Sequence, residues 1–210
     1  MIRLALGIPT INRSDLLYQA LEIYSVNWPQ RHIYVVDNGN QNVTSSNPWV
    51  QIHSPGFNLG VSASWNWTIK KAFENGYTHI AILNDDIIWK KSVREIERFI
   101  QENPAGLYVS GGTWCCFVLS YDAFLRVGGF DEGFFPAYFE DNDFCYRCRL
   151  AGIERVTDPF FSPEVYRNSM TIDKDKSLNT NFDINKEKFI LKWGGEPGKE
   201  NYTTPYDRKA

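Results

Sequence analysis

Apolar residues in the first half of the chain form two kinds of pattern. Short continuous apolar runs predict buried strands at residues 2–8, 32–37, 49–54 and 79–84. Apolar residues at helical spacing predict helices at 15–25, within 58–76 and at 90–102. Strands that alternate with helices in this way are typical of a mostly parallel sheet with helices on both faces. We therefore predict an α/β fold in which ligands bind beyond the carboxyl ends of the strands.

The second half of the chain has a different pattern. Residues 107–120 predict one or two strands, broken at two adjacent glycines, and a short helix follows them. Residues 138–152 predict a helix with acids in its first turn, where the helix dipole favours them. The polar tail contains one short helical patch, at 185–195. Because 210 residues suffice for one core, we predict a single domain with halves at 1–104 and 105–210.

Composition and charge exclude several classes of protein. Hydrophobic residues make up 43% and aromatic residues 15% of the sequence, as in a globular rather than a disordered protein. The formal net charge is −3 and the basic residues are spread out, so we expect no nucleic-acid partner. No run of about 18 apolar residues is present, so we expect no transmembrane segment. The N-terminus lacks the build of a signal peptide and fits a first strand.

The four cysteines are Cys115, Cys116, Cys145 and Cys148. Neighbouring residues of a strand point to opposite faces, so Cys115 and Cys116 are poorly placed to bind one ion. Cys145 and Cys148 lie in a predicted helix, and a redox role for them is the weakest of the alternatives. Free thiols in a reducing compartment fit best, which predicts a cytoplasmic location.

Acidic residues gather where the predicted fold places a ligand. Asp85 and Asp86 end the apolar run of a strand, where burying them without a partner would be costly. The other acids are Asp37, which ends an earlier strand, and Glu140, Asp141 and Asp143, which begin a helix. Each could instead cap a turn or a helix, or lie in a solvated loop. Together, in a chain without a glycine-rich phosphate loop, they predict Mg²⁺ or Mn²⁺ that holds a diphosphate.

Seven motifs, spread over nearly the whole chain, resemble those of one enzyme family. They are GIPTINR (7–13), VVDNGN (35–40), NLGVSASWN (58–66), ILNDDI (82–87), GGFDEGFF (128–135), FEDNDFCYR (139–147) and KWGG (192–195). The combination resembles a family-two nucleotide-sugar glycosyltransferase of the GT-A fold, close to the rhamnosyltransferase-like members. This resemblance implies a Rossmann-like, mostly parallel sheet flanked by helices, with a smaller antiparallel sheet on the acceptor side. Similar domains begin larger glycosyltransferases of large algal viruses, which implies further domains and the host cytoplasm.

The resemblance implies that the first half binds the nucleotide-sugar donor. Asp37 corresponds to the acid that accepts a hydrogen bond from the base, and Asp86 to the metal ligand. Asp85 would lie near the ribose or the donor sugar. The resemblance favours UDP as the nucleotide, with Mn²⁺ or Mg²⁺ as the cofactor. The residues implied to line the donor site are Pro9, Thr10, Asn12, Asp37, Asn58, Gly60, Asn66, Asn84 and Asp85.

The second half is implied to bind the acceptor, a hydroxyl of a glycan or glycoconjugate. Asp141 corresponds to the catalytic base, which takes the proton of the acceptor hydroxyl. That hydroxyl attacks the anomeric carbon from the face opposite the diphosphate, so the configuration inverts. Trp114, Tyr138 and Glu140 are expected to line the acceptor pocket. The transferred sugar would be a hexose or rhamnose.

The sequence departs from the family pattern in two places. Asn84 stands where the family has the first aspartate of Asp-x-Asp, and residues 164–170 lack the histidine that often also binds the metal. Arg167 could instead supply positive charge to the phosphates. A nucleotidyltransferase is less well supported, because it would carry a glycine-rich basic loop after the first strand. A non-catalytic domain that binds a nucleotide sugar or a glycan is the other alternative.

Overall fold

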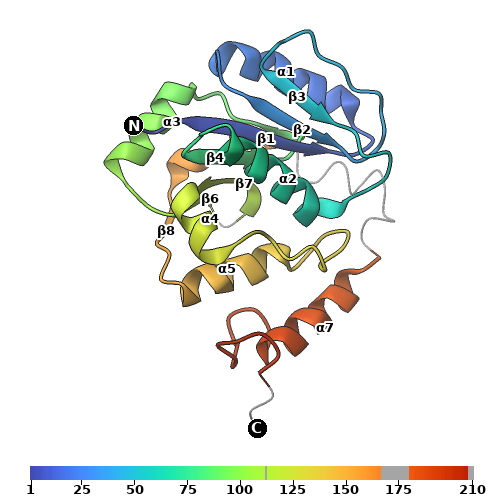
Figure 1. Ribbon diagram of the computed structural model, residues 1–210, viewed down its shortest axis with the longest axis vertical. Helices are drawn as coiled ribbons and strands as arrows, with labels where there is room; N and C mark the ends of the chain where they lie inside the picture. The colour runs from blue at the N-terminus through green and yellow to red at the C-terminus, as the bar shows by residue number, and fades with distance from the viewer. Residues whose placement is uncertain (112, 167–179, 208–210) are drawn as a thin grey trace.

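The computed structural model describes residues 1–111, 113–166 and 180–207 (Figure 1). The strands are β1 (Leu4–Thr10), β2 (Ile33–Asp37), β3 (Val50–His53), β4 (His79–Leu83), β5 (Ile87–Ile88), β6 (Leu107–Ser110), β7 (Thr113–Ser120), β8 (Arg155–Thr157) and β9 (Val165–Tyr166). The helices are α1 (Ser14–Asn27), α2 (Gly60–Glu74), α3 (Val93–Glu102), α4 (Tyr121–Val127), α5 (Glu140–Leu150) and α7 (Phe182–Trp193), with the 3₁₀ turn η1 (Pro159–Phe161). The predicted strands and helices of residues 1–104 are thus confirmed, with ends shifted by a few residues.

A seven-stranded sheet, in the order β3-β2-β1-β4-β7-β6-β8, forms the centre of the fold. β1 pairs in parallel with β2 and β4, whereas β7 runs antiparallel to β4 and β6. The predicted mostly parallel sheet is therefore confirmed. Since β1, β2 and β4 run in the same direction, their carboxyl ends meet at one edge, where Thr10 is in register with Asp37. The acidic segment that follows β4 begins at that same edge.

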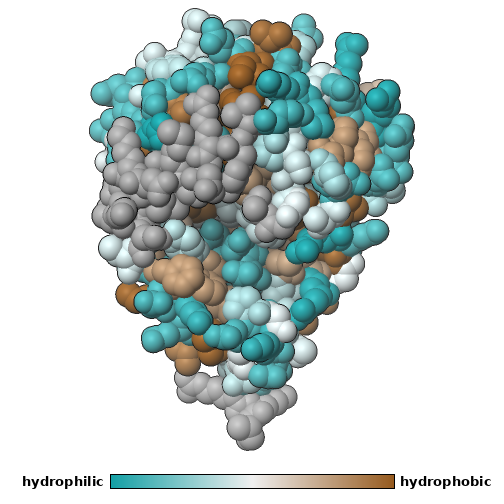
Figure 2. All heavy atoms as spheres, turned by 180° about the vertical axis from the view of Figure 1, so that it is seen from behind, coloured by the Kyte–Doolittle hydropathy of each residue, from teal (hydrophilic) through white to brown (hydrophobic). Residues whose placement is uncertain are grey.

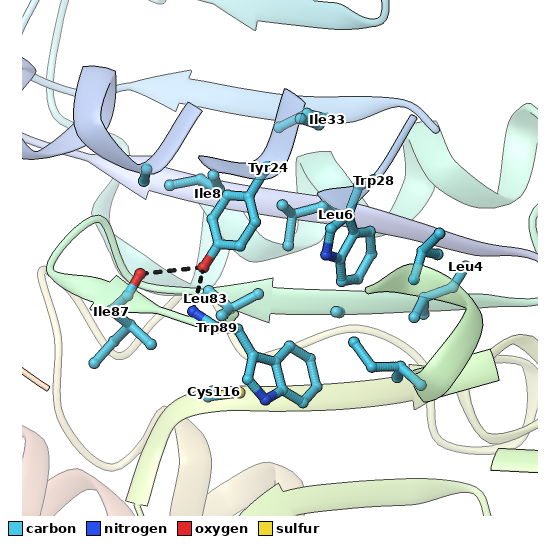
Figure 3. Packing of buried hydrophobic residues seen from close by; sticks show 14 of the residues in the cluster. Leu4, Leu6, Ile8, Tyr24, Trp28, Ile33, Leu83, Ile87, Trp89 and Cys116 are labelled. Carbon is cyan, nitrogen blue, oxygen red and sulfur yellow. Dashed lines mark hydrogen bonds between the residues drawn. The ribbon is translucent and has the colours of Figure 1, made fainter. Parts of the chain in front are cut away.

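Helices cover both faces of the sheet and give the fold three layers (Figure 1). α1 and α3 pack on one face together with Leu6 and Ile8 of β1, and α2, α4 and α5 pack on the other together with Ala5. Alternate side chains of β1 therefore face opposite layers, and both layers bury them. Figure 3 shows Tyr24 of α1 and Trp28, the residue that follows α1, lying against β1 in the first layer.

The segment between β4 and α3 differs from the prediction. α3 begins at Val93 rather than Lys90, because Ser92 caps it: Ser92 N donates to Glu95 Oε2 at 2.8 Å, and Ser92 Oγ accepts from Glu95 N. The residues before the cap form β5, which pairs antiparallel with β9. These two strands make a second, two-stranded antiparallel sheet, and its relation to an acceptor stays a prediction. A two-residue pairing between distant segments leaves no periodic signal in the sequence.

α7 is joined to the rest of the protein by the buried side chain of Lys192. Its Nζ lies 2.8 Å from Asp131 Oδ2 and 2.6 Å from Asp143 Oδ1. Trp193 Nε1 donates to the same oxygen of Asp143 at 2.8 Å, and Arg147 Nε donates to the other oxygen at 2.8 Å. Asp143 is fully buried. One of the three acids at the start of α5 is therefore committed to holding α7 in place.

The face of the molecule shown in Figure 2 is mostly polar. Figure 2 shows hydrophilic residues over most of one face, with hydrophobic residues showing in separate places. Within the described parts of the chain, none of the helices combines the length and the hydrophobicity needed to cross a membrane.

Candidate functional site

Asp85 and Asp86 lie in a tight turn directly after β4. Ile87 N donates to Asn84 O at 3.2 Å and closes the turn, and Asn84 N donates to Cys115 O at 3.0 Å and ties it to β7. Both carboxylate residues are only 5% exposed. Two adjacent acids with so little contact with water are costly to ionise unless a cation is near.

Tyr24 of α1 supports this turn from the interior of the protein. Its hydroxyl donates to Ile87 O at 3.2 Å and accepts from Trp89 N at 3.0 Å (Figure 3). The ring is fully buried, and burial raises the pKa of the Tyr24 hydroxyl, which therefore stays neutral. Two hydrogen bonds from one helix thus fix the backbone that leaves the acidic turn.

Thr10 connects the acidic turn to the end of β1. Its Oγ1 donates to Asp85 Oδ2 at 2.7 Å, and both residues are buried. Burial raises the pKa of Asp85 to about 7, against the lowering effect of the Thr10 hydrogen bond, and the charge of Asp86 adds to the rise. A carboxylate that is destabilised in this way gains more from a bound cation than an exposed one does.

Arg13 is a buried cation near these acids, and it had no predicted role although it ends the GIPTINR motif. Its Nε and Nη2 each donate to a carboxylate oxygen of Asp15 at 3.0 Å. This hydrogen-bonded pair raises the pKa of Arg13, and the charges of Asp85 and Asp86 add to the rise. A guanidinium in such a place is suited to phosphate oxygens.

Asp37 closes the turn that follows β2. Its carboxylate accepts hydrogen bonds from Gly39 N at 3.2 Å, from Gln41 N at 2.8 Å and from Gln41 Nε2 at 3.0 Å. Gln41 also accepts from Ser14 N at 2.6 Å and lies 3.5 Å from Thr10 Oγ1, so this unpredicted residue links the ends of β1 and β2 to α1. Asp37 is fully buried in this turn, and its contact with a nucleotide base stays a prediction.

The amino end of α2 contacts the loop that precedes α5. Asn58 Oδ1 accepts from Gly60 N at 2.8 Å, and Val61 N donates to Pro136 O at 2.8 Å. Gly60 has a φ of +80°, and a Cβ atom there would press on the ring of Phe135 at 2.9 Å. Glycine is therefore required for this close approach. The predicted donor residues Asn58 and Gly60 shape this end of the helix.

Glu140 and Asp141 begin α5, directly after two residues with left-handed backbone. Those residues, Tyr138 and Phe139, have φ values of 77° and 71°. Burial raises the pKa of Glu140 to about 8, and the charge of Asp141 adds to the rise. Among the residues that the structure describes, Glu140 Oε2 has no hydrogen-bond partner. Burial also raises the pKa of Asp141, which makes its carboxylate a stronger base than an exposed one.

The two segments that carry these acids both contact the start of β7. On one side, Cys115 O accepts the hydrogen bond from Asn84. On the other, the ring of Trp114 lies 6.3 Å from that of Phe144, one turn after Glu140 in α5. The start of β7 therefore contacts both the turn that carries Asp85 and Asp86 and the helix that begins with Glu140 and Asp141, and the predicted acceptor residue Trp114 makes the second contact.

The remaining predicted site residues include Asn66, Asn12 and Pro9. Asn66 Nδ2 donates to Phe130 O at 2.9 Å and its Oδ1 accepts from Phe130 N at 2.8 Å, which holds the loop after α4. Asn12 has a left-handed φ of 53°, and Pro9 precedes Thr10 in β1. Their contacts with a nucleotide stay predictions. Arg167 lies outside the described residues.

The acidic turn can offer two carboxylates to a metal ion. Over residues 1–111, 113–166 and 180–207, no three side chains of His, Cys, Asp and Glu come together as ligands. Mg²⁺ and Mn²⁺ commonly take only one or two carboxylates and complete their shells with water and phosphate oxygens. Asp85 and Asp86 fit such an ion, because they supply hard oxygen ligands and a buried negative charge. The four cysteines are free thiols.

The fold is similar to that of solved glycosyltransferases. The catalytic domain of Drosophila β1,4-galactosyltransferase 7, solved with xylobiose, matches with a TM-score of 0.61 and 16% identity, over 99% of this chain and 84% of that one. GalNAc-T7, solved with UDP, GalNAc and Mn²⁺, matches with a TM-score of 0.65 and 11% identity, over 91% of this chain and 51% of that one. No model of a protein family matches the sequence, and no curated protein matches it. These similarities confirm the predicted GT-A fold.

Proposed function

We propose that this chain is an inverting glycosyltransferase, which moves a sugar from a nucleoside diphosphate to a hydroxyl group of a glycan. One observation carries the proposal: the buried pair Asp85–Asp86 and the acids Glu140 and Asp141, of which Glu140 is buried, lie on segments that both contact the start of β7, beside the carboxyl edge of β4. Open α/β sheets bind ligands at that edge. Two enzymes of similar fold were solved with UDP, GalNAc and Mn²⁺ or with xylobiose, which supports this class of donor and acceptor.

In this proposal residues 1–104 bind the donor, which is a UDP-sugar. Asp86 and Asp85 would hold Mn²⁺ or Mg²⁺, and the metal, when bound, would act as a Lewis acid toward the leaving diphosphate. Arg13 adds a second positive charge near the same acids. Thr10 keeps Asp85 in place through its hydrogen bond. Gln41 fixes the turn at the end of β2 on which the base would rest.

Residues 105–210 supply the acceptor side and the base. The acceptor oxygen forms a bond to the anomeric carbon, while the bond from that carbon to the diphosphate oxygen breaks and leaves its electron pair on the diphosphate. The proton of the acceptor hydroxyl moves to a carboxylate oxygen of Asp141. The raised pKa of Asp141 favours this transfer. Attack from the face opposite the leaving group inverts the configuration. The proposal includes a cytoplasmic location, because free thiols are typical of a reducing compartment.

A panel of donors tests the proposal. UDP-, dTDP- and GDP-linked hexoses and rhamnose are incubated with the protein and Mn²⁺, with and without EDTA, and the release of nucleoside diphosphate is followed. We expect one UDP-sugar to be consumed, EDTA to stop its consumption, and Asp86→Ala to abolish it. Asp122→Asn, on the exposed side of α4, is the matched control and should leave the rate unchanged. UDP binding without turnover of any donor would instead favour the non-catalytic binding domain.

A further inference from the structure

We infer that Asn185 of α7 is a positioning residue, which holds loop 135–139 in the conformation that places Glu140 and Asp141. The inference rests on the proposed function, since it gives α7 a role toward the carboxylates of that reaction. It also makes a claim about the loop that can be tested without any turnover.

Loop 135–139 has an unusual backbone immediately before the two carboxylates. Tyr138 and Phe139 have φ values of 77° and 71°, a region in which bulky side chains are rarely found. Neither residue is a glycine, so surrounding contacts must hold this conformation. Because α5 begins at Glu140, these two residues decide the direction in which its first turn leaves the loop.

Asn185 supplies the hydrogen bonds that hold this loop. Its Nδ2 donates to Ala137 O at 2.8 Å and to Phe135 O at 3.2 Å. The residue is only 2% exposed, so water cannot replace these bonds. Asn181, one turn earlier, adds a second donor to Phe135 O at 3.0 Å. An aspartate at position 185 would have the same shape as asparagine, but its carboxylate oxygens cannot donate hydrogen bonds to the two carbonyl oxygens.

Ring contacts from α7 hold the two left-handed residues themselves. The centroid of the Phe182 ring lies 5.2 Å from that of Tyr138 and 5.2 Å from that of Phe139. On its other side the loop is bonded to α2, through the hydrogen bond from Val61 N to Pro136 O at 2.8 Å. The loop is therefore held between the helix that begins beside the donor edge and α7.

α7 is itself fixed to α5, so it can act as a rigid support. Lys192 and Trp193 both bind the buried carboxylate of Asp143, at 2.6 Å and 2.8 Å. Asp143 lies within one turn of Glu140. Figure 1 shows α7 below α5, on the side of the molecule far from α1. α7 thus acts on the segment that carries Glu140 and Asp141 through contacts with the loop before it and with Asp143 after it.

The test is the isosteric variant Asn185→Asp, with Leu191→Ala, at an exposed position of the same helix, as the matched control. For Asn185→Asp we expect kcat to fall at least tenfold, while the Kd of UDP in the presence of Mn²⁺ changes less than twofold. Hydrogen exchange should become faster at residues 134–141 and stay unchanged in the strands. Leu191→Ala should match the wild type in all three measurements.

The inference is wrong if Asn185→Asp keeps both the wild-type kcat and the wild-type exchange at residues 134–141. It is also wrong if UDP affinity and kcat fall in parallel with faster exchange along the whole chain, because the residue then serves only general stability. If Asn185→Asp does not fold, Phe182→Leu, at a half-exposed position, replaces it. For Phe182→Leu we expect kcat to fall severalfold, while the Kd of UDP changes less than twofold. If the wild type consumes no donor, the proposed function fails, and the exchange measurement alone decides the role of Asn185.

Discussion

Thr10 and Asp85 meet across the carboxyl ends of two paired strands, with Oγ1 and Oδ2 2.7 Å apart. β1 and β4 are parallel neighbours in the sheet, so this one bond connects the loop after β1 to the acidic turn after β4. It also favours the ionised form of Asp85 against the effect of burial. The proposed metal site therefore depends on a hydroxyl group that is not itself a ligand.

We expect Thr10→Val to weaken the binding of UDP with Mn²⁺ by about 10- to 100-fold. A hydrogen bond to a charged group contributes about 1.5–3 kcal/mol, and each 1.4 kcal/mol is about tenfold in affinity. Thr10→Ser keeps the hydroxyl and should stay within about threefold of the wild type by the same reasoning. Calorimetric titration measures both variants. Equal affinity for Thr10→Val and the wild type would show that the bond does not support the site.

Asp141→Asn should lower the rate of sugar transfer by about 10²- to 10⁴-fold, because a well-placed general base contributes that much. The affinity for UDP should hardly change, since Asp141 acts on the acceptor. Single-turnover kinetics with the donor found in the panel gives the rate. The exposed Asp122→Asn variant is the control, and a retained rate in Asp141→Asn would remove Asp141 from the reaction.

The stability of the protein should fall as the pH rises, in part because of Glu140. Its pKa is about 8 in the folded chain, against an ordinary value of 4.5. Between these values the folded state keeps a proton that the unfolded state has lost, so the stabilisation is complete below pH 4.5 and is lost as the pH rises through 8. A difference of this size corresponds to as much as about 5 kcal/mol.

Glu140→Gln cannot ionise, so its stability should decline less between pH 6 and pH 9 than that of the wild type. Asp141 and Tyr138 are its titratable neighbours and remain in both proteins. Urea denaturation at the two pH values provides the comparison, with the exposed Glu102→Gln as the control. Parallel declines in Glu140→Gln and the wild type would mean that Glu140 is already ionised at pH 6.

The sequence predicts elements whose signal is local, and it misses contacts between distant residues. The apolar run at 79–84 is buried on both faces and becomes β4, as expected for a parallel strand. The roles of Asp141 and Asp143 could not be told apart from the sequence, because the cation that binds Asp143 is Lys192 of α7, which is remote in sequence. Gln41 and Arg13 were missed for the same reason, since neither residue type marks a site until its partners are known.

Tyr24→Phe should destabilise the protein by about 1–3 kcal/mol, because Ile87 O and Trp89 N would lose their buried partner. The matched control is Tyr18→Phe, since Tyr18 lies on the same helix, is 44% exposed and accepts one hydrogen bond. Urea denaturation measures both. We also expect weaker binding of Mn²⁺ to Tyr24→Phe, since the turn that carries Asp85 would lose its support. A variant as stable as Tyr18→Phe would contradict this role.

Lys192→Met should destabilise the protein by about 3–5 kcal/mol, because it removes a partner of the buried carboxylate of Asp143. The matched control is Lys186→Met on the same helix. Lys186 pairs with Glu196 at the surface at 2.9 Å, and water screens such exposed pairs, so they contribute little to stability. Urea denaturation gives the loss in the free energy of unfolding for each variant, from the shift of the midpoint at an unchanged slope. Similar losses for both variants would mean that water reaches Asp143.

A ribosome completes the donor edge of the sheet, with β1, β2 and β4, well before it makes α7. Until Phe182 and Asn185 have left the ribosome, Tyr138 and Phe139 lack the rings and hydrogen bonds that hold the loop before α5. Domains generally fold as units during synthesis. On the proposed function, every residue that would bind the donor is therefore made before α7, but the transferase is complete only when α7 has been added.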